Sequence, residues 1–156
     1  MISVEIPGKR RLELSHLVLD MNGTLALDGK LLDGVAVRLR ALARKITVHV
    51  VTADTFGRAD ASFEGLPCEL VVLARDDQDV AKARYVRELG AGSTVAIGNG
   101  RNDAFLLESA ALGIAVILEE GAAAKTLLAS DIVTTSITSA LDLLTHPQRL
   151  VATLRR

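Results

Sequence analysis

The chain has 156 residues, a net charge of −1 and a mean hydropathy of +0.33, values typical of one globular domain with a substantial core. This charge gives no electrostatic footprint for nucleic acid, and no apolar run approaches the ~20 residues of a membrane helix. The first residues lack a basic segment followed by an apolar core, so we expect no signal peptide and a cytoplasmic location. The single cysteine, Cys68, excludes an internal disulfide and is expected to be a buried packing residue.

Strand-length apolar runs alternate with helical patterns along the chain. A small hairpin is expected first, with strands at 2–6 and 11–14 around Pro7-Gly8-Lys9. Further strands are expected at 17–20, 46–51, 69–73, 94–97, 114–118 and 132–134. Helices are expected at 34–45, 56–63, 78–89, 104–111, 122–129 and 139–144, with one more beginning at Pro147. The alternation predicts a single α/β domain over residues 1–156, built on a doubly wound parallel sheet.

The first core strand ends on a carboxylate and runs directly into a tight polar turn. Asp20 closes the apolar run, and the turn Met21-Asn22-Gly23-Thr24 follows it. Open α/β sheets bind ligands at the carboxyl ends of their strands, and the amides of such a turn can cradle an anion. A carboxylate beside an anion makes sense if a metal neutralises the charge or if the carboxylate attacks phosphorus.

Other polar residues are expected at the same edge of the sheet. Thr52 and Asp54 follow the second core strand, and the loop Gly98-Asn99-Gly100-Arg101-Asn102-Asp103 follows the fourth. Asn102 or Asp103 is expected to cap the helix that begins after this loop. A turn or capping role is the plainer alternative for each of these residues taken alone.

Lys82 lies in the first turn of its predicted helix, where the helix dipole disfavours a cation. A phosphate or a buried carboxylate at the strand ends would explain its position. A solvated basic face shared with Arg75, Arg84 and Arg87 is the alternative.

The three histidines, His16, His49 and His146, are not expected to cluster. His49 falls within a predicted buried strand. We therefore expect it to be a hydrogen-bonded core residue rather than a metal ligand.

Taken in chain order, these motifs resemble those of the haloacid dehalogenase-like (HAD) phosphohydrolase superfamily. The matching elements are Asp20-Met21-Asn22-Gly23-Thr24, the strand ending in Thr52, Lys82, and the loop 98–103. The stretch 95–116 looks most like the phosphorylation domain of P-type ATPases. Four elements that agree in order, within residues 17–144, are more specific than any one of them. The resemblance implies a three-layer HAD-like domain, a phosphorylated substrate and Mg²⁺ as cofactor.

The resemblance also implies a role for each matching position. Asp20 would be a Mg²⁺ ligand and the nucleophile that forms an aspartyl-phosphate, and Lys82 would neutralise its charge. The implied catalytic set is Asp20, Asn22, Thr52 and Lys82. The implied phosphate-binding set is Met21, Asn22, Gly23, Thr52, Ala53, Lys82 and Asn102. The implied metal ligands are Asp20, Asn22 through its backbone carbonyl, Asn99 and Asp103.

Two positions depart from the usual phosphatase pattern. Asn22 stands where many phosphatases carry an aspartate as general acid and base, a role typically worth about 10²–10⁴-fold in rate. An amide cannot exchange a proton near neutral pH. Asn99 replaces a metal-binding aspartate, so the site keeps an oxygen ligand but loses one negative charge. Slow or specialised phosphoryl transfer is the expected result.

The spacing of the motifs resembles that of the capless members of the superfamily. One helix and one strand fill each interval between Asp20, Thr52 and Lys82, and a small β-flap is expected at 25–30. An open site suits a macromolecular substrate or cover from another subunit, so a homo-oligomer is plausible.

Two other functions remain open from the sequence. One is a catalytically degenerate metal-binding, phosphate-binding or regulatory module, in which Asn22 and Asn99 mark lost catalysis. The other is a receiver-like signalling domain, although such domains normally carry the phosphoacceptor on the third strand. The retained residues Asp20, Thr52 and Lys82 favour a Mg²⁺-dependent phosphohydrolase or phosphotransferase.

Overall fold

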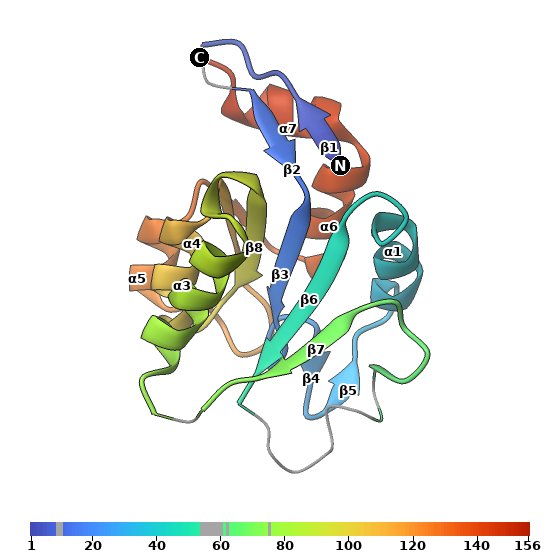
Figure 1. Cartoon of the computed structure of the whole chain (residues 1–156), viewed down its shortest axis with the longest axis vertical. Helices are drawn as coiled ribbons and strands as arrows, with labels where there is room; N and C mark the ends of the chain where they lie inside the picture. Colours follow the sequence, from blue (N-terminus) through green and yellow to red (C-terminus); the bar gives the residue numbers. More distant parts are fainter. Residues whose placement is uncertain (9–10, 54–60, 62, 75) are drawn as a thin grey trace.

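In the computed structural model, one six-stranded parallel sheet lies between two layers of helices (Figure 1). The structure describes residues 1–8, 11–53, 61, 63–74 and 76–156. The strand order is β10-β9-β8-β3-β6-β7, and every pairing in this sheet is parallel. Its strands are β3 (His16–Asp20), β6 (Thr47–Thr52), β7 (Glu69–Val72), β8 (Thr94–Gly98), β9 (Leu112–Val116) and β10 (Ile132–Thr134). The predicted doubly wound α/β fold is confirmed.

The alternation of side chains along β3 explains why both faces of the sheet are covered. Leu17 and Leu19 join the core beneath α1 (Val35–Leu42), α6 (Ile137–Thr145) and α7 (Pro147–Leu154). Val18 joins the opposite core beneath α3 (Gln78–Leu89), α4 (Ala104–Ser109) and α5 (Ala124–Ala129). Two short 3₁₀ helices, η1 (Ala91–Ser93) and η2 (Arg101–Asp103), precede β8 and α4. Asp20 ends β3 on the α3 side, which directs its carboxylate towards that helix.

Two small antiparallel sheets accompany the main sheet. The expected N-terminal hairpin forms from β1 (Ile2–Val4) and β2 (Leu12–Leu14), and β1 packs against α7. The expected flap forms from β4 (Ala26–Leu27) and β5 (Lys30–Leu31), immediately after the turn that follows Asp20. No described helix is long and apolar enough to cross a membrane.

Several expected boundaries shift by a few residues. The fifth strand begins and ends two residues earlier than predicted, and α6 begins earlier because Ser136 caps it by accepting a hydrogen bond from the Ser139 amide. Cys68 is half-buried rather than buried, and burial raises the pKa of its thiol. Lys9, Asp54 and most of the helix expected at 56–63 lie outside the described residues.

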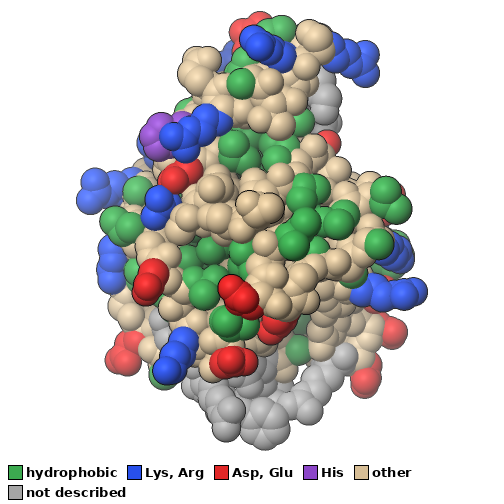
Figure 2. Space-filling model, turned by 180° about the vertical axis from the view of Figure 1, so that it is seen from behind, with side chains coloured by type: hydrophobic (Ala, Val, Ile, Leu, Met, Phe, Trp, Pro, Cys, Tyr) green, Lys and Arg blue, Asp and Glu red, His purple; other side chains and the backbone are tan. Residues whose placement is uncertain are grey.

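Charged side chains are unevenly distributed over the surface. Figure 2 shows the back of the molecule, where acidic side chains lie mostly in the half away from the chain termini, whereas basic side chains lie at the termini end and along both flanks. Asp28, in the turn between β4 and β5, and Glu119 and Glu120, in the loop between β9 and α5, are all exposed.

Candidate active site

A buried lysine joins two carboxylates at the carboxyl edge of the sheet. Lys82 Nζ lies 2.7 Å from Asp20 Oδ1 and 2.6 Å from Asp103 Oδ1. Lys82 is 2% exposed, Asp20 9% and Asp103 0%. Three elements supply these groups, since Asp20 ends β3, Lys82 lies on α3 and Asp103 ends η2. The expected buried-carboxylate partner of Lys82 is confirmed, and a solvated basic face is excluded for this lysine.

The three groups carry an unbalanced charge. Burial, followed by the negative charge of Asp103, raises the pKa of Asp20 to about 7 although Lys82 opposes the rise. Burial alone would lower the pKa of Lys82, but the two carboxylates outweigh it and the pKa is raised. One ammonium cannot balance two carboxylates, so this cluster has room for a further positive charge.

Asp103 organises the loop that follows β8. Its Oδ2 accepts hydrogen bonds from the amides of Asn99 at 3.0 Å and Gly100 at 2.9 Å. Gly98 permits this close approach, because a Cβ there would lie 2.6 Å from the Asp103 carboxyl carbon. Asp103 is the N-cap residue of α4, one of the two predicted, but its side chain makes no capping hydrogen bond to that helix. Asp103 occupies the cap position but binds Lys82 and the loop amides instead, which are the stronger partners for a buried carboxylate.

Asn102 faces α3 rather than α4. Its Nδ2 donates to Gln78 Oε1 at 2.9 Å, which ties the loop to the first turn of the helix that carries Lys82. Asn102 is partly buried. Its predicted contact with phosphate stays a prediction.

Thr24 is a site residue that the sequence reasoning missed. Its hydroxyl is fully buried and lies 3.4 Å from Asp20 Oδ2 and 3.2 Å from Asn99 Oδ1. Asn99 Nδ2 donates to the Gly121 carbonyl at 3.0 Å, which turns the amide oxygen of Asn99 towards Thr24. One hydroxyl proton serves only one of the two oxygens at a time, so the other keeps lone pairs for a cation.

This donor set fits a hard divalent cation such as Mg²⁺. Asp20 Oδ2 and Asn99 Oδ1 are hard oxygens, they converge on Thr24, and the neighbouring charge is negative. Among the described residues no group of three or more His, Cys, Asp and Glu side chains could hold a metal. A bound cation would therefore depend on amide and backbone oxygens and on water. Both oxygens of Asp103 already accept hydrogen bonds, so its role as a ligand stays a prediction.

The turn after β3 offers fewer free amides than expected. The Gly23 amide donates to the Ala26 carbonyl at 2.9 Å, and the Thr24 amide donates to the Met21 carbonyl at 3.3 Å. The amides of Met21 and Asn22 are therefore the better candidates for contact with an anion. Asn22 is exposed, as suits a residue at the mouth of the site.

Gly23 lies next to Glu120, a second residue at the mouth of the site that the sequence reasoning missed. It has φ +74°, and a Cβ there would lie 2.3 Å from Glu120 Oε2 and 2.7 Å from Asn99 Nδ2. Glu120 comes from the loop between β9 and α5, and that loop is also tied to Asn99 through Gly121. The pair Glu119-Glu120 before a glycine was the only sequence signal for this contact.

Thr52 and Ala53 lie at the end of β6, the neighbour of β3. Thr52 is 2% exposed, and its carbonyl accepts the Leu73 amide at 2.8 Å. Ala53 is partly buried. Their position at the end of the strand beside Asp20 agrees with the predicted phosphate site, but contact with phosphate stays a prediction.

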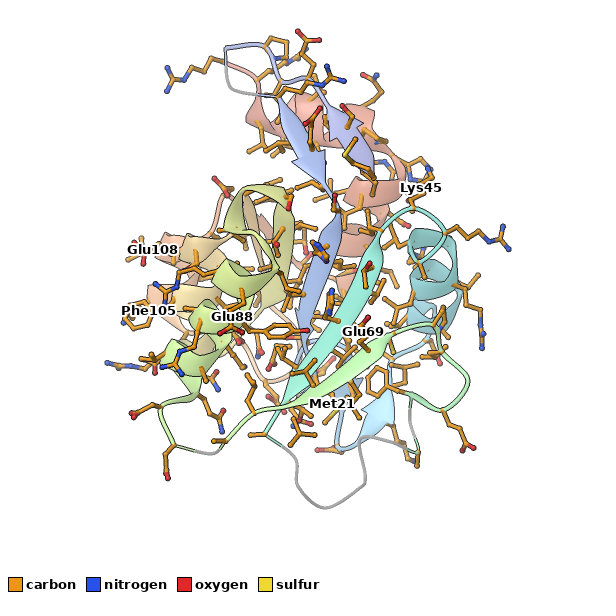
Figure 3. The ribbon with its side chains drawn as sticks, in the orientation of Figure 1. Met21, Lys45, Glu69, Glu88, Phe105 and Glu108 are labelled. Atoms are coloured by element: carbon orange, nitrogen blue, oxygen red, sulfur yellow. The ribbon has the colours of Figure 1, made fainter. Side chains whose placement is uncertain are left out.

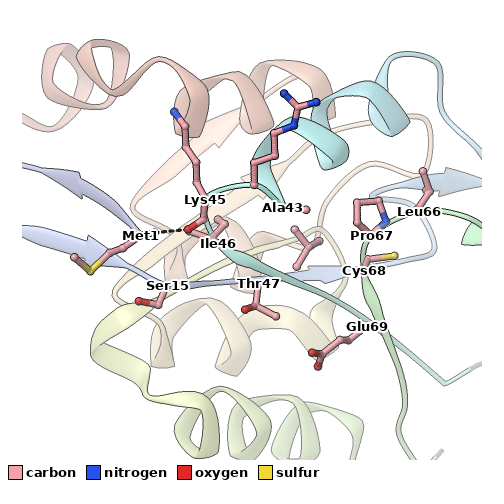
Figure 4. Close-up of a pocket in the computed structure, with 12 residues that line it drawn as sticks. Met1, Ser15, Ala43, Lys45, Ile46, Thr47, Leu66, Pro67, Cys68 and Glu69 are labelled. Carbon is pink, nitrogen blue, oxygen red and sulfur yellow. Dashed lines mark hydrogen bonds between the residues drawn. The ribbon is translucent and has the colours of Figure 1, made fainter.

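The amino end of the sheet holds different features. The expectation that the histidines do not cluster is wrong for two of them, because His16 Nδ1 lies 3.1 Å from His49 Nε2. His49 is buried with hydrogen-bond partners, as predicted. A groove of about 580 Å³ also lies at this end, between Met1, the stretch 43–48 and the stretch 66–69 (Figure 4). None of the predicted site residues lines it.

Comparison with known proteins places the chain in a family. No protein-family model matches it. It is 49% identical over 82 residues to the uncharacterized protein MJ0073 of Methanocaldococcus jannaschii, a match that covers 50% of this chain and 88% of MJ0073. The chain belongs to the MJ0073 family. This membership brings no activity with it.

Solved structures show the fold more specifically. A protein assigned to the HAD family of hydrolases from Streptomyces avermitilis has a TM-score of 0.69 at 20% identity, over 87% of each chain. The 3-deoxy-D-manno-octulosonate 8-phosphate phosphatase of Moraxella catarrhalis, solved with magnesium, phosphate and KDO, has 0.69 at 19% identity, over 89% of this chain and 90% of that one. The cobalt-bound deoxy-D-mannose-octulosonate 8-phosphate phosphatase of Haemophilus influenzae has a TM-score of 0.72 at 15% identity, over 92% of this chain and 94% of that one. This MJ0073-family chain therefore has the HAD-like fold.

Proposed function

We propose that this protein is a Mg²⁺-dependent phosphohydrolase or phosphotransferase that forms an aspartyl-phosphate on Asp20. The observation that carries the proposal is the Lys82 ammonium, buried between Asp20 and Asp103 at the carboxyl edge of the sheet. An ion pair of one ammonium and one carboxylate is neutral, whereas this cluster contains a second carboxylate. The Thr24 hydroxyl and the Asn99 amide oxygen lie beside it. The HAD-like fold shared with phosphatases supports a phosphate ester or anhydride as the substrate.

In the proposed mechanism Asp20 attacks phosphorus and the substrate oxygen leaves with its bonding electrons. Water then attacks the phosphorus of the aspartyl-phosphate, which releases inorganic phosphate and restores the carboxylate. Lys82 offsets the negative charge that gathers around Asp20, and Asp103 holds Lys82 in place. Thr52 is proposed to bind a phosphoryl oxygen, together with the amides of Met21 and Asn22.

Asp20 Oδ2, Asn99 Oδ1 and the Asn22 carbonyl would hold Mg²⁺, which would supply positive charge next to the phosphoryl oxygens. Asp103 stays in the proposed ligand set as a prediction. Asn22 has no acidic group that can donate a proton near neutral pH, so protonation of the leaving group is the step that we expect to be slow.

The test is hydrolysis of an activated aryl phosphate and of acetyl phosphate, with and without Mg²⁺, by the wild type and Asp20→Asn. We expect Mg²⁺-dependent turnover that the variant lacks, and acid quenching should trap phosphate on the peptide that contains Asp20. Turnover that survives in Asp20→Asn would overturn the covalent mechanism.

The exchange of aspartates for Asn22 and Asn99 supports a second candidate, a metal-binding or phosphate-binding regulatory module without catalysis. Absence of turnover in folded wild-type protein, together with Mg²⁺-dependent binding of inorganic phosphate, would favour this module. The same preparation of protein answers both questions.

A further inference from the structure

A hydrogen-bonded network of three side chains, His16, His49 and Tyr85, lies between the sheet and α3, away from the proposed chemistry; His49 is buried, and His16 and Tyr85 are partly buried. His16 Nδ1 lies 3.1 Å from His49 Nε2, and the Tyr85 hydroxyl lies 2.9 Å from His49 Nδ1. His49 is 2% exposed, and Glu69 on β7 approaches its Nδ1 at 3.2 Å. Each neutral imidazole has one donor and one acceptor, so the two rings can connect β3 to the tyrosine of α3.

The surroundings of His49 and Tyr85 keep these two side chains in the protonation states that the hydrogen bonds need near neutral pH. Burial lowers the pKa of His49, with Glu69 opposing the shift and His16 adding to it, which favours the neutral ring. Burial, followed by Glu69 and Glu88, raises the pKa of Tyr85, so the phenol keeps its proton. Figure 3 labels these carboxylates on β7 and α3.

Tyr85, the last member of this hydrogen-bonded network, lies on α3, the helix that also carries Lys82. Gln78, Lys82 and Tyr85 are four and three residues apart, so they lie along one stripe of α3. Gln78 binds Asn102, Lys82 binds the two site carboxylates, and Tyr85 binds His49. Three polar contacts therefore join this stripe to the site loop and the sheet.

Apolar packing gives α3 little help in choosing its position along the sheet. The fully buried apolar side chains of this helix are Ala83 and Val86, which are both small, and the partly buried Leu89 packs against the same core. Small apolar contacts set the distance between helix and sheet but tolerate sliding, because they are not directional. A hydrogen bond loses its strength when the donor moves out of line, so it fixes the register.

We propose that the chain His16–His49–Tyr85 positions Lys82 by fixing the register of α3 on the sheet. Lys82 lies three residues before Tyr85, about 4.5 Å along the helix axis. A slide of α3 would lengthen the contacts of 2.7 and 2.6 Å that hold the ammonium between Asp20 and Asp103. Tyr85 is thus a positioning residue. The catalytic consequence rests on the proposed function, whereas the placement of Lys82 does not.

The test removes the tyrosine hydroxyl and measures access to the Lys82 amine. Tyr85→Phe keeps the ring that packs edge-on against His49 at 5.7 Å, so the variant should fold. We expect reductive methylation of Lys82, followed residue by residue with mass spectrometry, to become about tenfold faster, the factor that corresponds to one hydrogen bond. The rates at Lys30, Lys45 and Lys125 should stay unchanged. On an activated aryl phosphate, kcat should fall by a similar factor with little change in KM.

Ser136→Ala is the matched control, because it removes a helix-capping hydrogen bond from α6, which has no contact with Lys82. Equal protection of Lys82 in Tyr85→Phe and Ser136→Ala, at similar loss of stability, would overturn the proposal. His49→Leu should expose Lys82 as Tyr85→Phe does, and the double variant should add little, because both changes break one chain. Additive effects would also overturn it. The labelling result holds even if no phosphatase activity is found, which separates this inference from the proposed function.

Discussion

Two ion pairs in this molecule use similar side chains in opposite surroundings. Arg38 on α1 donates to Asp142 on α6 at 2.7 and 3.0 Å, and both side chains are partly exposed. Lys82 meets Asp20 and Asp103 at comparable distances but is buried with them. The first unit is neutral, whereas the second carries an excess carboxylate.

The pKa values of the carboxyl groups show what this difference means. The hydrogen bond from Arg38 lowers the pKa of Asp142, as expected for a carboxylate with a cation of its own. Burial raises the pKa of Asp20 to about 7 despite Lys82, and Asp103 adds to the rise. One pair joins two helices, and the other leaves a carboxylate that a cation or a phosphoryl group can stabilise.

The largest expected effect comes from removing the buried cation. Lys82→Met keeps most of the side-chain volume but leaves Asp20 and Asp103 facing each other, so the free energy of unfolding should fall by about 3–5 kcal/mol. Turnover should fall to the background rate. Urea unfolding and kcat of the variant check both expectations. Lys125→Met, which removes an exposed lysine on α5, is the control, and an equal loss of stability in both variants would contradict the argument.

Asn22→Asp should restore a proton donor at the mouth of the site. Because Asn22 is exposed, the change should leave stability unaffected, and hydrolysis of unactivated phosphate esters should speed up by as much as about 10²-fold. Asn22→Ser, which also lacks a titratable group, should show no gain. Steady-state kinetics on an alkyl phosphate decide between these outcomes. Equal rates in both variants would mean that another step limits turnover.

The excess carboxylate should also appear in the pH dependence of stability. The pKa of Asp20 rises from 3.8 to about 7 on folding, so the folded protein holds the proton more tightly. The stability gained in this way is fully present below about pH 4 and is lost as the pH rises through about 7. Metal-free wild type should therefore lose more stability between pH 5 and pH 8 than Asp20→Asn does. Parallel curves for the two proteins in urea unfolding would show that Asp20 does not carry the excess charge.

Asn99→Asp should moderately increase the affinity of the predicted metal site for Mg²⁺. The substitution adds a negative charge where the Asn99 amide oxygen now faces Thr24, so Mg²⁺ should bind several-fold more tightly. Isothermal titration with Mg²⁺ measures the change. Asn102→Asp on the same loop is the control, because the side chain of Asn102 binds Gln78 instead. An unchanged affinity in Asn99→Asp would place Asn99 outside the metal site.

Local sequence pattern was sufficient for most of the sheet and for the elements that carry the site. The apolar run before Asp20 predicted β3, and the spacing at 78–89 predicted the helix that carries Lys82. The buried-carboxylate hypothesis for Lys82 followed from helix electrostatics, since a cation at that end of a helix needs a reason.

Contacts between loops and between strands could not be predicted from the sequence. Thr24 bridges Asp20 and Asn99 only because two loops meet, and Glu120 reaches Gly23 only because a third loop joins them. His16 and His49 are 33 residues apart and meet through the register of β3 and β6, which no local pattern specifies. Asp103 occupies the predicted cap position, but its carboxylate binds Lys82 and the amides of its own loop, which the local pattern did not indicate.

The smallest expected effect comes from breaking the neutral ion pair between Arg38 and Asp142. Arg38→Gln should lower the free energy of unfolding only slightly, because a partly exposed pair is solvated in both states and little is left uncompensated when it breaks. Asp142→Asn should have a similar effect, and a double-mutant cycle should show that the two changes are not additive. In both variants kcat should stay unchanged, since α1 and α6 cover the face of the sheet opposite to α3. If breaking this pair reduced kcat as strongly as Lys82→Met does, then the distinction between an ion pair that joins helices and one that serves chemistry would not hold. A small loss of stability with full activity would instead show that burial and charge balance, rather than the presence of an ion pair, set the two regions apart.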